Sequence, residues 1–494
     1  MLNGGLFNLI SGTDVRGVAV GNTEQITLTD GAVKSIICAF VKWLNAKHGI
    51  NNPAVAVGND SRISAPRILS AVKEALIESG CKVIYTGLSS TPSMFMILQH
   101  RAIDASVMIT ASHMPYDKNG LKFFIKSGGI DAKDLHEILT LAESGERLHG
   151  EGSYFEQPFM DEYSDMLVKK VEAECGKLPL KGKKIIVDAG NGVGGFFAEK
   201  VLKPLGADTE GSQFLEPDGN FPNHIPNPEN RDAILSLGLA VIRNNADLGI
   251  IFDTDVDRAA LVDRHGVEIN RNRLIALISA ILFQEKCGVI VTDSVTCDSL
   301  TDFIESLGGE HLRFKRGYKN VIDKCRELNE SGIYSPLAIE TSGHAAFKEN
   351  YYLDDGAYLT VKLLTSFAKQ AREGKNLTSL IEGFEEPKEE VELRLTFTAD
   401  SKDFRAEGES VISHLKLLST IDKSIRIAPQ NYEGVKLYFE EGSAILRMSV
   451  HDPVMPINAE SNIEGGTKKI VKRLLIYLKD FIFLDTDILR NFIY

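Results

Sequence analysis

The sequence predicts three related α/β domains followed by a separate α+β domain, and three observations lead to this fold class. A pattern of apolar strand, helix and glycine recurs three times within residues 54–309 of the 494-residue chain. A charged segment with a proline, residues 385–390, then interrupts the pattern as an interdomain linker does. Beyond it, strand-like segments at 391–399, 435–439 and 444–450 precede one long amphipathic helix, which is typical of an α+β arrangement.

Each of the three copies begins with an apolar, β-branched strand that ends in a small or acidic turn. The expected strands lie at 54–62, 183–192 and 288–296, the expected helices end at Ile77 or cover 196–205 and 299–307, and the glycines that follow are Gly80, Gly206 and Gly308–Gly309. Strands that alternate with helices of this length indicate α/β units with largely parallel sheets. One long doubly wound domain would show the same rhythm, so that alternative stays open.

Domain boundaries are expected where the sequence becomes polar or charged. One falls at residues 150–157, and another at the 385–390 segment, after which a helix is expected from Thr467 to about Leu484. The resulting division is four domains: an α/β domain at 1–157, an α/β domain at 158–265, an α/β domain at 266–385 and a C-terminal α+β domain at 386–494.

Composition restricts the classes of function. The formal net charge of -13 disfavours nonspecific binding to nucleic acid or to an anionic membrane, although a cleft can still be basic enough for an anionic substrate. The six cysteines are scattered without a CxxC pair, which favours reduced thiols in a cytoplasmic protein over disulfides or a zinc site. The N-terminal segment lacks the basic region of a signal peptide, and the most apolar run, 274–283, is too short to span a bilayer.

The segment TASHMP, residues 110–115, is the first candidate for chemistry. It follows ASVMI, which has the pattern of a buried strand, so the segment begins a loop at the carboxyl end of that strand, where α/β sheets place ligands. Ser112, between Ala111 and His113, would present an accessible hydroxyl. An ordinary polar loop would have the same local composition, and the segment alone does not decide between the two.

The segment DTDVDR, residues 253–258, follows a second apolar strand and carries three aspartates. We expect strand alternation to direct Asp253, Asp255 and Asp257 to one side, where a cation would relieve their repulsion. Oxygen ligands of this kind select magnesium, calcium or manganese. An EF-hand is excluded because Arg258 occupies the place of its glycine and Arg264 that of its bidentate glutamate. A solvated acidic turn is the alternative.

Three further segments carry weaker signals. Gly190, Gly192 and Gly195 fit the dinucleotide-binding pattern, with Asp208 and Glu210 downstream, but a glycine-rich turn without a nucleotide is favoured because the other two copies lack the pattern. Glu340, Ser342 and His344 share one short turn and could bind sugar hydroxyls. Arg447, Ser449 and His451 alternate along a predicted strand and suit a phosphate clamp, and either group could instead be a surface network.

Taken together and in this order, these segments resemble the α-D-phosphohexomutase superfamily, and most closely its phosphomannomutase/phosphoglucomutase type. The resemblance covers nearly the whole chain. The similar segments are SGTDVRG at 11–17, GNDSRIS at 58–64, TASHMP as the phosphoserine loop, NGLK at 119–122, DTDVDR as the metal loop, ETSGH at 340–344 as the sugar-specificity loop, and RMS at 447–449 as the start of the phosphate-binding loop. The resemblance implies mixed sheets in the three α/β domains and a central cleft among the four domains.

The resemblance also implies roles for particular residues. Ser112 would carry the phosphoryl group, and Mg²⁺ would be bound by Asp253, Asp255, Asp257 and the phosphoserine. The catalytic group would be Ser112, His113, Lys122, Arg16 and His344, and the substrate-binding group would be Arg258, Gly317, Tyr318, Glu340, Ser342, Arg447, Ser449 and His451.

The function implied is interconversion of hexose 1-phosphate and hexose 6-phosphate, of mannose or glucose, by way of a hexose 1,6-bisphosphate. Three departures leave the substrate preference open: Thr254 replaces a glycine of the metal loop, Tyr318 a frequent histidine, and Val450 with His451 the usual Asn and Thr of the phosphate loop. The alternatives are a phosphoglucosamine mutase, a non-catalytic sugar-phosphate-binding protein, and an NAD-dependent enzyme at the glycine motif. No nucleic-acid or membrane partner is expected.

Overall fold

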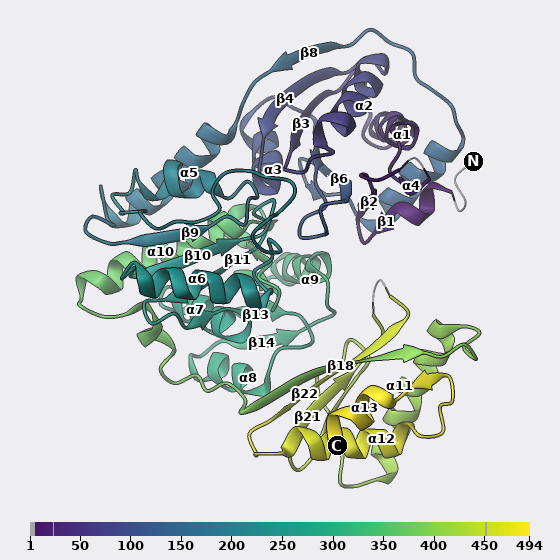
Figure 1. The fold of residues 1–494 in the computed structure, drawn as a ribbon, viewed down its shortest axis with the longest axis vertical. Coiled ribbons are helices and arrows are strands. Elements are labelled where there is room, and N and C mark those ends of the chain that lie inside the picture. Colours follow the sequence, from purple (N-terminus) through teal and green to yellow (C-terminus); the bar gives the residue numbers. More distant parts are fainter. Residues whose placement is uncertain (1–4, 23, 450–451) are drawn as a thin grey trace. The chain divides into compact units, whose positions relative to one another are not determined.

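The computed structural model describes residues 5–22, 24–449 and 452–494. The chain forms two compact units (Figure 1). The first unit comprises residues 1–270 and 342–379, and the second comprises residues 271–341 and 380–494. Each unit is described by itself.

The first unit begins with an eight-stranded mixed sheet in the order β1-β2-β6-β5-β3-β4-β8, with β7 paired to β6. Strands β5, β3, β4 and β8 are parallel neighbours, whereas β6 runs antiparallel to β5 and to β2. The strands are β1 Ile10–Ser11, β2 Asp14–Val18, β3 Ala54–Asn59, β4 Lys82–Leu88, β5 Ala105–Ile109, β6 Lys118–Ile125, β7 Gly128–Gly129 and β8 Ser153–Glu156.

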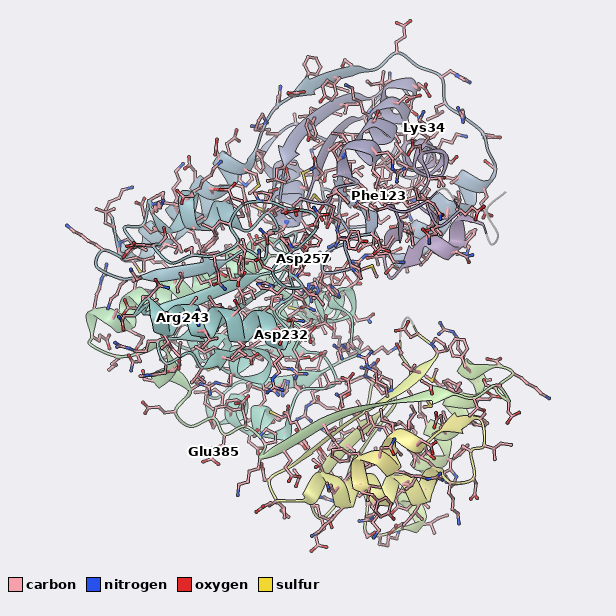
Figure 2. All side chains as sticks on the ribbon, viewed as in Figure 1. Lys34, Phe123, Asp232, Arg243, Asp257 and Glu385 are labelled. Atoms are coloured by element: carbon pink, nitrogen blue, oxygen red, sulfur yellow. The ribbon has the colours of Figure 1, made fainter. Side chains whose placement is uncertain are left out.

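Helices α1 Asp30–His48, α2 Ala65–Glu78 and α4 Ala132–Glu143 share one hydrophobic core with this sheet. Phe40 of α1 packs on Phe123 of β6 with ring centroids 4.6 Å apart, and Phe123 is labelled in Figure 2. Ser90 begins helix α3, Thr91–His100, by accepting a hydrogen bond from the N–H of Ser93. Burial of five successive residues in β5 shows that both faces of this strand are covered, as in an α/β/α layer structure.

The second sheet of the first unit has the order β12-β11-β10-β9, in which only β9 and β10 are parallel. Its strands are β9 Ile185–Asp188, β10 Leu248–Phe252, β11 Ala259–Asp263 and β12 Glu268–Ile269, with α6 Arg231–Arg243 packed against β10 and β11. Helix α5, Met160–Cys175, packs against α10, Gly356–Arg372. An antiparallel hairpin of β16 Ala345–Phe347 and β17 Leu353–Asp354 precedes α10.

The second unit contains three parallel strands in the order β14-β13-β15 and a C-terminal antiparallel sheet. The parallel strands are β13 Val289–Thr292, β14 Glu310–Arg313 and β15 Leu337–Ile339, and the helices between residues 271 and 330 are α7 Arg271–Phe283, α8 Asp298–Ser306 and α9 Tyr318–Glu330. This arrangement of strands and helices is the expected α/β pattern.

The C-terminal sheet has the order β19-β20-β21-β22-β18-β23, and every neighbouring pair is antiparallel. Helices α11 Phe404–Ile421, α12 Gly466–Leu478 and α13 Asp487–Ile493 cover one face of it and share its hydrophobic core (Figure 1). The strands are β18 Glu389–Phe397, β19 Arg426–Ile427, β20 Val435–Tyr438, β21 Gly442–Leu446, β22 Val454–Ser461 and β23 Leu484–Asp485.

The predicted fold class is confirmed: α/β domains with mixed sheets are followed by a sheet-containing C-terminal part. Two elements differ from the expectation. The helix expected at 196–205 is a short π-helical segment, Phe197–Leu202. The helix expected to continue to Leu484 ends at Leu478, because Leu484 pairs with Phe397 as part of β23. The division into four domains with these boundaries stays a prediction.

Among the described residues, no helix is both long enough and apolar enough to cross a lipid bilayer.

Candidate active site

Ser112 lies in the loop that follows β5, as predicted. Its φ angle is +52°, so the residue adopts the left-handed conformation that a side chain other than glycine seldom takes. The residue is 3% exposed, and its Oγ donates a hydrogen bond of 2.9 Å to Oδ2 of Asp253. Arg258 Nη2 and His113 Nδ1 each lie 3.4 Å from the same Oγ. The serine hydroxyl therefore faces the aspartate loop, 141 residues later in the chain.

Asp253, Asp255 and Asp257 converge, but strand alternation is not the cause. Strand β10 ends at Phe252, and the segment turns at Val256, whose φ angle is +65°. One oxygen from each carboxylate lies within 4.8 Å of one oxygen from each of the others, and the residues are 0–2% exposed. The expectation of a strand that continues through the aspartates is wrong, because a tight turn brings the three carboxylates together.

The carboxylate cluster is suited to a hard divalent cation. Asp255 Oδ1 and Asp257 Oδ1 are buried and accept no hydrogen bond from the described residues, which is costly for an ionised oxygen unless a cation completes its environment. Lys122 from β6 supplies the nearby positive charge: its Nζ lies 2.5 Å from Asp257 Oδ2 and 3.2 Å from Asp255 Oδ2. An all-oxygen donor set that includes Ser112 Oγ matches the preference of Mg²⁺.

Burial and neighbouring charges separate the acidities of these carboxylates. Burial raises the pKa of Asp253 well above its ordinary value, and the nearby Asp257 adds to the shift. Burial alone would also raise the pKa of Asp257, but Lys122, His344 and Arg258 hold it well below the ordinary value. Asp253 therefore keeps a proton more readily than Asp257 in the absence of a cation. Asp257 is labelled in Figure 2.

His344 forms a partly buried ion pair with a carboxylate that the sequence interpretation missed. Its Nδ1 contacts Asp354 Oδ2 in β17, ten residues later. Burial opposes protonation of His344, but Asp354 and Asp257 outweigh it and raise the pKa of His344 to about 9. The backbone of His344 forms a β-bridge with Arg258, so the histidine is fixed beside the aspartate loop. At neutral pH His344 is thus an imidazolium that can donate a proton.

Arg258 is buried in the first unit, with its guanidinium directed at the aspartate loop. Its Nε lies 3.2 Å from Asp253 Oδ2, and its Nη1 donates to Asn227 Oδ1 over 3.2 Å.

Burial, together with the charges of Arg258 and Arg16, lowers the pKa of His113 to about 2. His113 is therefore neutral at physiological pH. Arg16 donates to Asp14 over 2.8 Å.

Five predicted substrate-binding residues lie in the second unit. Glu340 is 4% exposed and accepts a hydrogen bond of 2.6 Å from the N–H of Gly317. This contact joins two of the predicted residues at the start of α9, and Tyr318 is the first residue of that helix. Arg447 follows β21 and is 5% exposed, and Ser449 Oγ accepts the N–H of Asp452. His451 lies outside the described residues. Ser342, in the first unit, is 8% exposed.

Arg316 is a cationic neighbour of Arg447 that the sequence interpretation did not assign. Burial lowers the pKa of Arg447, and the positive charge of Arg316 lowers it further. Burial raises the pKa of Asp293, and both guanidinium groups oppose this rise. The local signal was the second basic residue of KRGYKN, which precedes Gly317 directly. Two adjacent guanidinium groups suit a phosphate better than one does.

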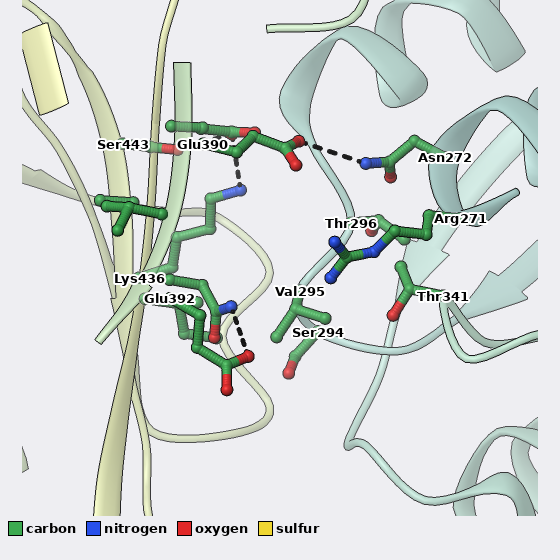
Figure 3. A pocket seen from close by; sticks show the side chains of 15 residues that line it. Arg271, Asn272, Ser294, Val295, Thr296, Thr341, Glu390, Glu392, Lys436 and Ser443 are labelled. Carbon is green, nitrogen blue, oxygen red and sulfur yellow. Dashed lines mark hydrogen bonds and ion pairs between the residues drawn. The ribbon is translucent and has the colours of Figure 1, made fainter. Parts of the chain in front are cut away.

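A pocket of about 100 Å³ in the second unit lies between α7, the loop before α8 and the C-terminal sheet (Figure 3). Arg271 extends its guanidinium into it, and Glu390 and Glu392 face it from β18 (Figure 3). Buried Lys436 bonds to Asp298 over 2.9 Å. The lining of this pocket therefore carries charged side chains of both signs.

The glycines of the 190–195 motif have structural roles. Gly190 adopts a φ angle of +52°. A Cβ atom on Gly192 would lie 2.6 Å from the carbonyl oxygen of Thr254, and one on Gly195 would lie 2.3 Å from that of Leu215. Gly192 thus permits close contact with the aspartate loop, which supports the interpretation without a nucleotide.

Comparison with known proteins identifies the family of this chain. Models of the phosphoglucomutase/phosphomannomutase alpha/beta/alpha domains I, II and III match residues 9–148, 161–266 and 270–386. A phosphoglucomutase of Neisseria gonorrhoeae is 29% identical over 464 residues, which are 93% of this chain and 94% of that protein. A phosphoglucomutase/phosphomannomutase of Thermococcus kodakarensis is 29% identical over 466 residues, 93% and 95% of the two chains.

Among solved structures, a phosphoglucomutase/phosphomannomutase family protein of Burkholderia thailandensis superposes with a TM-score of 0.80 at 27% identity, and covers 96% of this chain and 97% of its own. The fold and the cluster of serine, carboxylates and cations define a class of α/β protein with a site for phosphoryl transfer. The chain belongs to the phosphoglucomutase/phosphomannomutase family.

Proposed function

We propose that this chain is a phosphohexomutase that interconverts the 1-phosphate and 6-phosphate of mannose or glucose through a phosphoserine at Ser112 and a hexose 1,6-bisphosphate. The observation that carries the proposal is the contact of the Ser112 hydroxyl with Asp253 in a cluster that also contains Lys122, Arg258 and His344. A serine hydroxyl held among carboxylates and cations is suited to exchange of a phosphoryl group.

Mg²⁺ is the cofactor that these residues fit. Asp253, Asp255, Asp257 and the phosphorylated Ser112 would hold it, and the two carboxylate oxygens without hydrogen bonds support this donor set. When bound, the ion would supply positive charge to the transferring phosphoryl group. A protein of similar fold, the N-acetylphosphoglucosamine mutase of Aspergillus fumigatus, was solved in complex with GlcNAc-6P and magnesium, at 15% identity and a TM-score of 0.52.

In the proposed reaction, the bond between Ser112 Oγ and phosphorus breaks and a bond from phosphorus to a sugar oxygen forms. The proton of the sugar hydroxyl passes to a base, and the departing Ser112 Oγ takes up a proton from an acid and becomes a hydroxyl again. Transfer back from the other end of the bisphosphate regenerates the phosphoserine. His344 is fixed by Asp354 and Arg258 and is protonated at neutral pH, so it suits the role of the acid that returns a proton. Neutral His113 is suited to hydrogen bonding with Ser112.

The predicted substrate-binding residues are assigned as follows. Glu340 and Ser342 would bind sugar hydroxyls, together with Gly317 and Tyr318. Arg447 and Ser449 would bind the phosphate that is not reacting, and burial of Arg447 supports this because a buried guanidinium binds a phosphate strongly.

We also keep the four-domain division at residues 157, 265 and 385 and a cytoplasmic location as proposals. The location is supported by the six cysteines, none of which forms a disulfide.

Intact mass spectrometry beside a mutase assay tests the proposal. Purified protein should carry phosphate on the peptide that contains Ser112, and added glucose 1,6-bisphosphate should raise both this fraction and the turnover. Ser112→Ala should lose most turnover and still bind glucose 1-phosphate. Ser93→Ala, a change on buried α3, is the matched control and should keep the phosphate. Full turnover by an enzyme whose Ser112 is never modified would contradict the proposal.

A further inference from the structure

Arg62 is buried against the loop that contains Ser112, and both Nη atoms of its guanidinium donate hydrogen bonds to that loop. Its Nη1 donates to the carbonyl oxygens of Pro115 and Lys118 over 2.7 and 2.8 Å. Its Nη2 donates to those of Ser112 and Met114 over 2.5 and 2.6 Å. The residue is 1% exposed. Four backbone carbonyls of one loop therefore converge on one guanidinium group.

Asp60 and Thr110 connect this arginine to the nucleophile. The Nε atom of Arg62 lies 3.3 Å from Asp60 Oδ2, and the same oxygen accepts the hydroxyl of Thr110 over 2.7 Å. Thr110 Oγ1 in turn accepts the N–H of Ser112 over 2.9 Å. The chain of contacts thus begins at a buried ion pair and ends at the backbone nitrogen of the serine itself.

The other face of Arg62 is covered by a loop from the second sheet of the first unit. The ring of Phe221 lies over the guanidinium, with 5.3 Å from Cζ to the ring centroid. Gly219 packs so closely that a Cβ atom there would lie 2.5 Å from the carbonyl oxygen of Ser61. Arg62 is therefore held from both sides, and a shorter side chain could not fill the same place.

We propose that Arg62, with Asp60 and Thr110, is the positioning device that keeps Ser112 in its left-handed conformation and aims its Oγ at Asp253. A φ angle of +52° is strained for a residue other than glycine, so surrounding contacts must impose it. Because the C=O and N–H of one trans peptide point in opposite directions, the carbonyl of Ser112 on Arg62 turns the N–H of His113 away from the arginine. That backbone donor is then available to a phosphoryl group on Ser112. None of the three residues touches substrate in this proposal, which rests on the proposed phosphoserine function.

Arg62→Lys tests the inference, because lysine keeps the charge but offers three donors without the planar fork. Arg67→Lys is the matched control: Arg67, on α2, also donates to two backbone carbonyls, but these belong to Ala19 and Leu28 and not to the loop of Ser112. We expect Arg62→Lys to lower kcat about 10–100-fold, since misplacement by about 1 Å costs about 100-fold. The KM should stay within about threefold, phosphorylation of Ser112 by glucose 1,6-bisphosphate should slow, and amide exchange in residues 110–118 should quicken.

Arg67→Lys should change none of these readouts. Thr110→Val, of similar size, is the second variant if Arg62→Lys does not fold, and it should lower kcat in the same way. A wild-type kcat in folded Arg62→Lys, or an equal loss in Arg67→Lys, overturns the inference while the wild-type protein still carries phosphoserine. If the wild-type protein turns over without phosphoserine, the proposed function fails instead, and amide exchange in residues 110–118 alone then decides whether Arg62 fixes the loop.

Discussion

Removal of Lys122 should destabilise the first unit strongly and make its stability depend on magnesium. Lys122 is 5% exposed, and its Nζ contacts both Asp257 and Asp255. Lys122→Met keeps much of the side-chain volume and leaves two buried carboxylates without their cation. Loss of one partner of a buried pair costs about 3–5 kcal/mol, which exceeds the usual effect of a substitution.

Mg²⁺ should return part of this loss. In the wild-type protein the ion must compete with Lys122 for the carboxylates, and in Lys122→Met it need not, so its affinity should rise. A tenfold tighter affinity corresponds to about 1.4 kcal/mol. The difference in unfolding free energy between the two proteins should therefore shrink from about 3–5 kcal/mol in EDTA to about 2–4 kcal/mol in excess Mg²⁺. Turnover should be lost in both conditions.

Urea unfolding followed by tryptophan fluorescence measures this difference. Trp43 is the single tryptophan of the chain, and it is buried in α1 of the first unit, beside the sheet that holds Lys122. Lys362→Met is the control, because Lys362 is a buried lysine of the same unit that bonds to Glu349 over 3.1 Å, away from the aspartates. Its unfolding should not depend on Mg²⁺. If Lys122→Met is as stable as the wild type in EDTA, or shows no added response to Mg²⁺, the charge argument is refuted.

Three further predictions concern the metal, the phosphate clamp and the histidine. Exhaustive chelation should abolish turnover and Mg²⁺ should restore it, whereas Asp255→Asn should weaken Mg²⁺ binding in calorimetry; full activity after chelation would contradict the metal assignment. Arg447→Ala should raise KM by one to two decades, since a charged hydrogen bond is worth about 1.5–3 kcal/mol, and Arg316→Ala should act in the same direction; unchanged KM values would exclude both arginines. His344 has a pKa of about 9 in the folded protein against about 6.5 in the unfolded chain. The contribution of the protonated histidine to the free energy of unfolding is therefore complete below pH 6.5 and is lost as pH rises through 9. In EDTA, the melting temperature should fall more steeply between pH 6.5 and 9 for the wild type than for His344→Asn. Equal slopes would contradict the ion pair.

Much of the fold and the centre of the site could be predicted because they depend on local pattern. Strand β5 is a run of five buried residues, and Ser112 follows it where parallel strands end. The strands and helices of the first and third copies match their predicted positions within a few residues. Periodicity also explains the failures. The aspartate segment continues an apolar strand in the sequence, yet Val256 at a φ angle of +65° ends the alternation, and nothing in a period of two predicts that turn.

The partners of the site residues could not be predicted, because they depend on tertiary contacts. Asp354 reaches His344 only because β16 and β17 form a hairpin in which Ala346 pairs with Asp354. Arg62 belongs to the segment GNDSRIS that carries part of the family resemblance, but the sequence assigns it no role. Its four carbonyl partners lie about fifty residues away in the chain. A sequence shows which residue types are present, but the ligands of a buried guanidinium follow only from the packing of the loops around it.

The charges of the site explain why the cation and the phosphoryl group belong together. The cluster holds four carboxylates, those of Asp253, Asp255, Asp257 and Asp354, beside the cations of Lys122, Arg258 and His344, so three of the four negative charges have a positive partner. A phosphoserine would add about −2 to this cluster, and Mg²⁺ would add +2. The phosphoserine without the cation would leave a large uncompensated negative charge in a buried site, and the two together would leave the charge of the cluster unchanged. Affinity for Mg²⁺ should therefore be higher when Ser112 is phosphorylated, and by linkage the phosphorylated state should be more stable in Mg²⁺. Calorimetric titration of the phosphorylated and dephosphorylated protein with Mg²⁺ measures this coupling, and equal affinities would show that the two charges do not share one site.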